Sequence, residues 1–109
     1  MLQPEKRPKA IAGVTTRYAL GCGNLYVTVN SKDGQAFEVF ATLGKAGGCP
    51  QAMLEAICRM VSVVLRAGVD AQVIVKHLRG VQCPQSAWED GEQLLSCPDC
   101  IGRALEAQP

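Results

Sequence analysis

The chain is poor in aromatic side chains and almost lacks histidine. Its 109 residues include two Tyr, two Phe, one Trp and one His. With so few aromatic rings, Val, Leu, Ile, Ala and Met must supply most of the core. The single histidine excludes a histidine-rich metal centre, and it leaves any Cys–His catalytic pair dependent on that one side chain.

Long apolar segments are also missing. No apolar run approaches the roughly 20 residues that a membrane helix needs. Residues 1–10 are polar and lack the apolar segment of a secretory signal peptide. We therefore expect a cytoplasmic protein with no membrane partner. The net charge is only +1, which argues against strong binding to a nucleic-acid backbone.

Size and composition predict one folded domain preceded by a short tail. The chain is 48% hydrophobic and 19% charged, which excludes a disordered chain and suits a single core. Residues 1–10 offer little to bury, so we expect a flexible basic tail there. Its prolines and basic residues are Pro4, Lys6, Arg7, Pro8 and Lys9. Residues 11–109 are expected to form the domain.

The first half of the domain has the residue pattern of β-strands. Residues 14–20 are rich in β-branched and aromatic side chains, and residues 25–30 alternate apolar with polar side chains. An Asp-Gly turn at residues 33–34 leads into a return strand over residues 36–43. These segments predict a three-stranded antiparallel β-meander.

The hydrophobic period changes after residue 50. Apolar residues recur at intervals of three and four over residues 51–67, which predicts an amphipathic helix. We expect a second helix over residues 70–78 and a third over residues 98–107, with a loop around Trp88 between them. Three strands followed by three helices packed on them define an α+β fold.

Six cysteines are the unusual feature of the chain. In a reducing compartment, this density points to metal or thiol chemistry rather than to structural disulfides. Cys58 lies within a predicted helix and suits a small buried hydrophobe. The other five lie in turns or loops, or at a helix start, where a bent backbone can bring thiolates together around zinc. They are Cys22, Cys49, Cys83, Cys97 and Cys100. Their spacing alone leaves both zinc ligands and unligated loop cysteines open.

Cys97 and Cys100 have the C-x-x-C spacing of thiol–disulfide motifs. At a helix start, the backbone N–H groups and the helix dipole would lower the pKa of Cys97 and make its thiol reactive. No βαβ unit surrounds the pair, so a thioredoxin fold is excluded. A dithiol electron shuttle remains an alternative for these two residues.

Several ordered motifs together resemble the TSCPD domain. This domain lies near the C-terminus of adenosylcobalamin-dependent (class II) ribonucleotide reductases and also occurs as short free-standing proteins. The resemblance covers about residues 7–107. The motifs are Gly21–Asn30, Phe37–Phe40, Gly44–Cys49, Glu55–Ile57 with Arg59, Leu78–Val81 with Cys83 and Pro84, and Ser96–Asp99 with Ile101.

The resemblance implies a zinc site that ties the sheet to the helices. The cysteines that match the family pattern, and that would bind the metal, are Cys22, Cys49, Cys83 and Cys97. Four thiolates would form a closed tetrahedral site, and structural zinc contributes on the order of 10 kcal/mol. Cys58 stands where the pattern usually has a small residue. Cys100 stands where it usually has alanine, so Cys100 is an alternative ligand or a redox partner of Cys97.

The resemblance also limits the function. The catalytic barrel of the reductase is absent, so we expect no catalytic residues, no cobalamin and no enzyme activity from this chain alone. We expect a zinc-binding accessory or interaction domain in deoxyribonucleotide synthesis, whose partner is a ribonucleotide reductase catalytic chain. One alternative is a dithiol shuttle for a reductase. A further, less favoured one is a nucleic-acid-binding module that uses Lys6, Arg7, Lys9 and Arg17.

Overall fold

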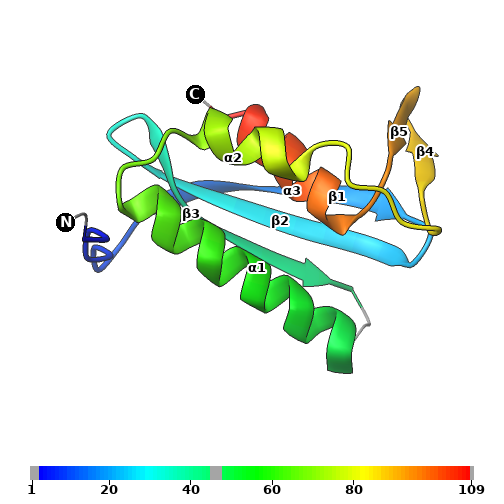
Figure 1. The fold of residues 1–109 in the computed structure, drawn as a ribbon, viewed down its shortest axis with the longest axis horizontal. Helices are drawn as coiled ribbons and strands as arrows, with labels where there is room; N and C mark the ends of the chain where they lie inside the picture. The colour runs from blue at the N-terminus through cyan, green and yellow to red at the C-terminus, as the bar shows by residue number, and fades with distance from the viewer. Residues whose placement is uncertain (1–2, 45–47, 109) are drawn as a thin grey trace.

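The computed structural model describes residues 3–44 and 48–108. A three-stranded sheet is followed by two helices, a small hairpin and a third helix (Figure 1). The elements are β1 (Ala12–Leu20), β2 (Gly23–Lys32), β3 (Gln35–Leu43), α1 (Gly48–Arg66), α2 (Ala71–Leu78), β4 (Ala87–Glu89), β5 (Glu92–Leu94) and α3 (Cys97–Glu106). The predicted α+β fold and the meander are therefore confirmed.

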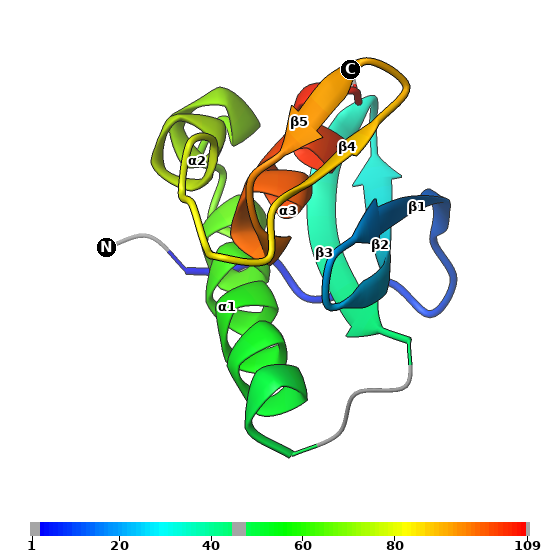
Figure 2. The ribbon, with the colours of Figure 1, turned by 90° about the vertical axis from the view of Figure 1, so that its right-hand side faces the viewer.

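The sheet follows the predicted alternation. It is antiparallel with the order β1-β2-β3, and Asp33 and Gly34 form the turn between β2 and β3 with positive φ angles of 53° and 77°. Leu25, Val27 and Val29 are 0–1% exposed. Figure 2 shows α1, α2 and α3 on one side of this sheet, so that these side chains face the helical layer.

The β4–β5 hairpin stands where the sequence predicted a loop. Its two strands have three residues each, which is too short for an alternation of apolar and polar residues to be recognised. Asp90 and Gly91 form its turn with φ angles of 51° and 80°, so a second Asp-Gly turn marks the position in the sequence. The hairpin leaves Trp88 70% exposed.

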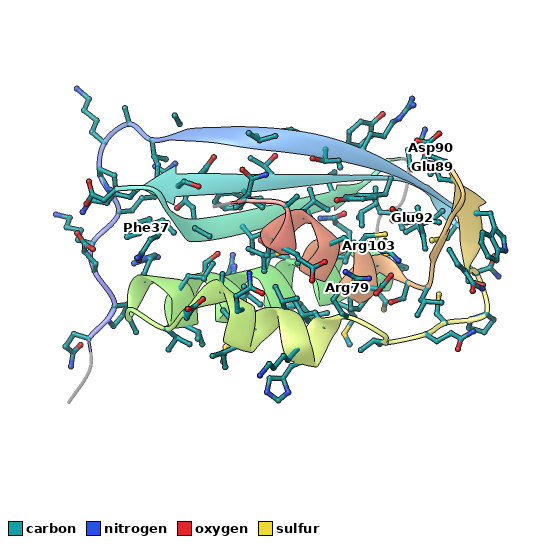
Figure 3. All side chains as sticks on the ribbon, turned by 90° about the horizontal axis from the view of Figure 1, so that it is seen from above. Phe37, Arg79, Glu89, Asp90, Glu92 and Arg103 are labelled. Atoms are coloured by element: carbon teal, nitrogen blue, oxygen red, sulfur yellow. The ribbon has the colours of Figure 1, made fainter. Side chains whose placement is uncertain are left out.

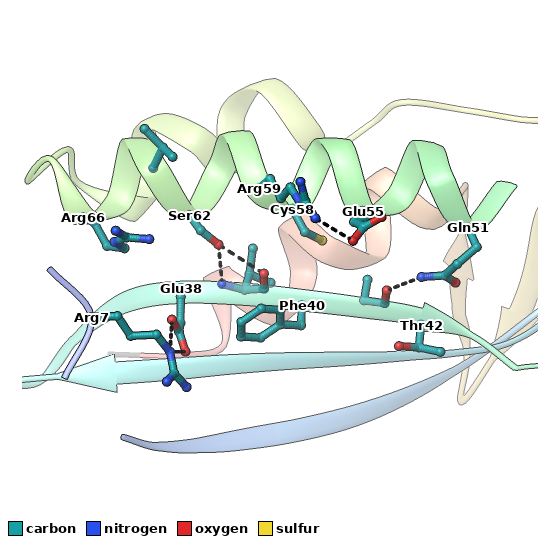
Figure 4. Close-up of a pocket in the computed structure, with 13 residues that line it drawn as sticks. Arg7, Glu38, Phe40, Thr42, Gln51, Glu55, Cys58, Arg59, Ser62 and Arg66 are labelled. Atoms are coloured by element: carbon teal, nitrogen blue, oxygen red, sulfur yellow. Dashed lines mark hydrogen bonds and ion pairs between the residues drawn. The ribbon is translucent and has the colours of Figure 1, made fainter. Parts of the chain in front are cut away.

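Helix α1 takes the place of a fourth strand along the free edge of β3 (Figure 4). The Ser62 hydroxyl accepts a hydrogen bond from the Val39 N–H at 3.0 Å and lies 3.2 Å from the Val39 carbonyl. The Gln51 amide bonds the Leu43 N–H and the Ala41 carbonyl at 3.1 and 3.2 Å. Backbone groups that would be unpaired at this sheet edge are thereby satisfied.

Helix α1 is also long and apolar enough, by length and composition alone, to cross a membrane. Here its apolar face packs against β3 through buried residues that include Leu54, Cys58, Val61 and Leu65. Core helices of globular proteins meet the same criterion, so this property carries little weight.

Part of the N-terminal segment lies against the domain. The Glu5 N–H donates to the Arg66 carbonyl at 2.8 Å, and the Arg66 side chain donates to the Glu5 carbonyl at 2.9 Å. The Nε of Arg7 lies 2.8 Å from the Glu38 carboxylate, which is 1% exposed and also accepts from Asn30 at 2.7 Å. Residues 5 and 7, which the sequence places in a flexible tail, thus make specific contacts.

Candidate functional site: a group of thiols at the start of α3

The start of α3 is fixed by the residues around Cys97. The Ser96 hydroxyl accepts from the Asp99 N–H at 3.1 Å and donates to the Val81 carbonyl. Pro98 occupies the first helical turn, where its missing N–H costs nothing. This N-cap holds Cys97 at the end of the helix that faces the preceding loop.

The buried carboxylate of Asp99 joins this helix to two loops. It accepts hydrogen bonds from the backbone N–H groups of Gly80 and Leu95 at 2.9 and 3.2 Å. The Nε atoms of Arg79 and Arg103 donate to it at 3.2 and 3.1 Å, and Figure 3 shows both arginines beside α3. Burial alone would raise the pKa of Asp99, but these hydrogen bonds and Arg103 hold it below its usual range.

Two backbone hydrogen bonds bring distant cysteines toward Cys97. The Cys83 N–H donates to the Leu95 carbonyl at 3.0 Å, which places Cys83 beside the residues that precede α3. The Gly21 N–H donates to the Gln85 carbonyl, also at 3.0 Å. A Cβ atom at Gly21 would stand only 2.7 Å from that carbonyl oxygen, so the approach of the β1–β2 turn requires glycine.

Two of the other predicted zinc ligands, Cys22 and Cys83, thus each come within interaction range of Cys97. Cys22 is exposed, whereas Cys83 and Cys97 are half-buried. Burial raises the pKa of Cys97 to about 12, and a hydrogen bond with Cys22 and the nearby thiol of Cys83 contribute to the increase. The expectation that the helix start lowers this pKa is therefore wrong, because burial and the neighbouring thiols raise it more than a backbone hydrogen bond lowers it.

The fourth predicted ligand lies apart from this group. Cys49 is exposed near the beginning of α1, and it is not among the residues that influence the pKa of Cys97. Over the same residues, no group of three or more His, Cys, Asp or Glu side chains has an arrangement that could hold a metal ion. The complete ligand set stays a prediction.

The remaining two cysteines are buried. Cys100 is 0% exposed, and burial, the charge of Asp99 and the neighbouring Cys97 raise its pKa to about 12. Cys58 is 3% exposed, and burial raises its pKa to about 11 although its sulfur interacts with the Ala41 backbone. Its predicted place in the core is confirmed. Neutral thiols are poor nucleophiles, so these pKa values argue against a Cys97–Cys100 dithiol shuttle.

The protein is thus a small α+β domain in which cysteines from the β1–β2 turn and from the loop before β4 approach a cysteine at the start of the last helix. The chain matches the family model of the TSCPD domain over residues 2–108, and it belongs to that family. The TSCPD domain is linked to ribonucleotide reductase. The chain matches no curated protein and no solved structure.

Proposed function

We propose that this chain is a non-catalytic, zinc-binding accessory domain that docks on the catalytic chain of a ribonucleotide reductase. The observation that carries the proposal is the approach of Cys22 and Cys83 to Cys97 from three separate segments. Thiolates are preferred zinc ligands, and structural zinc sites draw them from turns and helix starts. The chemistry of these three thiols therefore suits zinc, and a closed site requires a fourth ligand to join them.

The fourth ligand in this proposal is Cys49. It is exposed next to Gly48, whose φ of 64° lies in the left-handed region, so a bend precedes it. The start of α1, the β1–β2 turn and the segment before β4 all lie toward the right-hand end of Figure 1. Cys100 is the alternative ligand. Its side chain points from α3 into the core and is fully buried, so it would have to move out of the core to bind zinc.

Zinc would connect layers that are otherwise joined mainly by noncovalent packing. The ligands come from the β1–β2 turn, the start of α1, the loop before β4 and the start of α3. Binding requires that each thiol lose its proton, so zinc would also reverse the raised pKa of Cys97.

The outer face of α1 is the proposed docking surface for the reductase chain. Met53, Met60 and Val63 are 65%, 66% and 43% exposed on this helix. Adjacent exposed apolar side chains of this kind mark interaction surfaces, and flexible Met side chains adapt well to a partner. The link of the family to ribonucleotide reductase indicates which partner to test.

Two measurements test the proposal separately. Zinc analysis of purified protein is expected to give one ion per chain, and protein without zinc whose melting curve ignores a chelator would refute the metal site. Pull-down with a reductase catalytic chain that lacks its own TSCPD segment is expected to fail for Met60→Glu. Trp88→Glu, an exposed position on β4, is the matched control and should bind normally. Equal capture of both variants would refute docking through α1.

A further inference from the structure

The face of the sheet that points away from the helices carries two neighbouring aromatic rings. Tyr26 on the central strand is 41% exposed, and Phe40 on β3 is 49% exposed. In the strand register, Tyr26 pairs with Thr42 and Phe40 with Thr28, so the two rings are diagonal neighbours on the same face. The Phe40 ring lies on the side of β3 away from α1 (Figure 4).

Side chains cover one end of this outer face, whereas the other end is exposed to solvent. At the closed end, the Asn30 side chain lies over Gly13, where a Cβ atom would stand only 1.9 Å from its oxygen, and reaches the buried Glu38. Toward the other end, Thr15 and Thr28 share a hydrogen bond of 2.7 Å between exposed hydroxyls. Tyr26 and Phe40 belong to this open part, which no helix among the described residues covers (Figure 2).

Basic side chains lie on the open face and along its β3 edge. Arg17 is exposed and pairs directly with Tyr26 across β1 and β2. Arg7, Arg59 and Arg66 line a cavity of about 590 Å³ that also includes Phe40. Within this cavity Arg7 pairs with Glu38 and Arg59 with Glu55, whereas the Arg66 side chain donates to the Glu5 carbonyl rather than to a carboxylate.

We propose that this face binds single-stranded nucleic acid, with bases stacked on Tyr26 and Phe40 and phosphates near Arg17 and the arginines beside β3. Flat, exposed rings next to cationic side chains are the arrangement by which proteins hold single strands without reading a sequence. A duplex hides the flat surfaces of its bases, so it cannot use these rings. The inference concerns a surface separate from the cysteines and does not depend on zinc.

The experiment measures binding of a fluorescently labelled oligothymidylate of about ten nucleotides. Wild-type protein should bind this strand more tightly than a duplex of the same length. Tyr26→Leu and Phe40→Leu keep an apolar surface but remove the ring, and each should weaken binding by about 5- to 150-fold. Arg17→Gln should weaken binding and reduce its dependence on salt.

Controls keep the result interpretable. Tyr26→Phe retains the ring and should bind like the wild type, and Trp88→Leu removes a more exposed ring from the β4–β5 hairpin. Melting curves and zinc content are measured on every variant. They show whether weaker binding comes from the missing ring or from unfolding or loss of metal. Absence of binding at low salt, equal affinity for duplex, or wild-type affinity of both leucine variants would overturn the inference.

Discussion

The thiol of Cys97, the first residue of α3, interacts with the thiol of Cys22 in the turn between β1 and β2. The two residues come from opposite ends of the chain and from different layers of the fold. Cys83 approaches the same thiol from the loop before β4. This convergence is the observation on which the proposed zinc site rests.

Asp99 should make stability depend on acid pH. Its folded-state pKa lies below its unfolded value of about 3.9, so its contribution is complete above that pH and is lost as the pH falls through the folded pKa. Asp99→Asn should lower the free energy of unfolding at pH 7 by about 1–3 kcal/mol and weaken its decline below pH 4.

Urea titrations at several pH values measure this effect. Asp33→Asn, in the exposed β2–β3 turn, is the matched control because Asn tolerates the positive φ there. If the free energy of unfolding fell equally in acid for Asp99→Asn and the wild type, Asp99 would not be the source of this pH dependence.

Ser62 should be important for stability because it satisfies the edge of β3. Ser62→Ala leaves the buried N–H and carbonyl of Val39 without their partner, so we expect a loss of about 1–3 kcal/mol. Thr42→Val, an exposed change of similar shape on the same strand, should alter stability far less. Chemical denaturation of both variants checks the prediction, and equal midpoints would show that α1 does not protect this edge.

Arg7 should stabilise the domain although it lies in the basic segment that the sequence predicts to be a dispensable tail. Arg7→Ala leaves the buried carboxylate of Glu38 with Asn30 as its remaining described partner, and we expect a loss of about 1–3 kcal/mol. In a Glu38→Gln background the same change should cost much less, because the buried charge is gone. An equal cost in both backgrounds would show that the ion pair is not the cause.

Metal-free protein should show a wide spread of thiol reactivity. Burial raises the pKa values of Cys58, Cys97 and Cys100 to about 11, 12 and 12, so all three are neutral at pH 8 and should react slowly with iodoacetamide. Exposed Cys22 should react first. Mass spectrometry of the labelled peptides measures the order, and rapid labelling of Cys97 at neutral pH would revive the dithiol alternative.

Features with a local signal could be predicted from the sequence. The alternation at Leu25, Val27 and Val29 predicted the central strand, and the apolar period after residue 50 predicted α1. Contacts between distant residues leave no such period. The ion pair of Arg7 with Glu38 and the hydrogen bonds of Ser62 to Val39 depend on the tertiary arrangement, so they emerged only from the structure.

The candidate site was predictable to a similar extent. Turns and helix starts marked Cys22, Cys83 and Cys97, because a bent backbone lets separate segments converge. The pKa of Cys97 was not predictable, since burial and neighbouring thiols, rather than position in the helix, decide it. Asp99 belongs to the motif Ser96–Asp99, but only the structure shows that the Gly80 and Leu95 N–H groups bind its carboxylate.

The most direct test of the central claim is zinc content in a panel of single Cys→Ser variants at positions 22, 49, 83, 97 and 100, with Cys58→Ala as the control. The account predicts one zinc per chain in the wild type, in the control and in Cys100→Ser. It predicts loss of zinc and a much lower melting temperature for serine at the other four positions. Wild-type protein without zinc, or zinc retained by the Cys22, Cys83 and Cys97 variants alike, would contradict it.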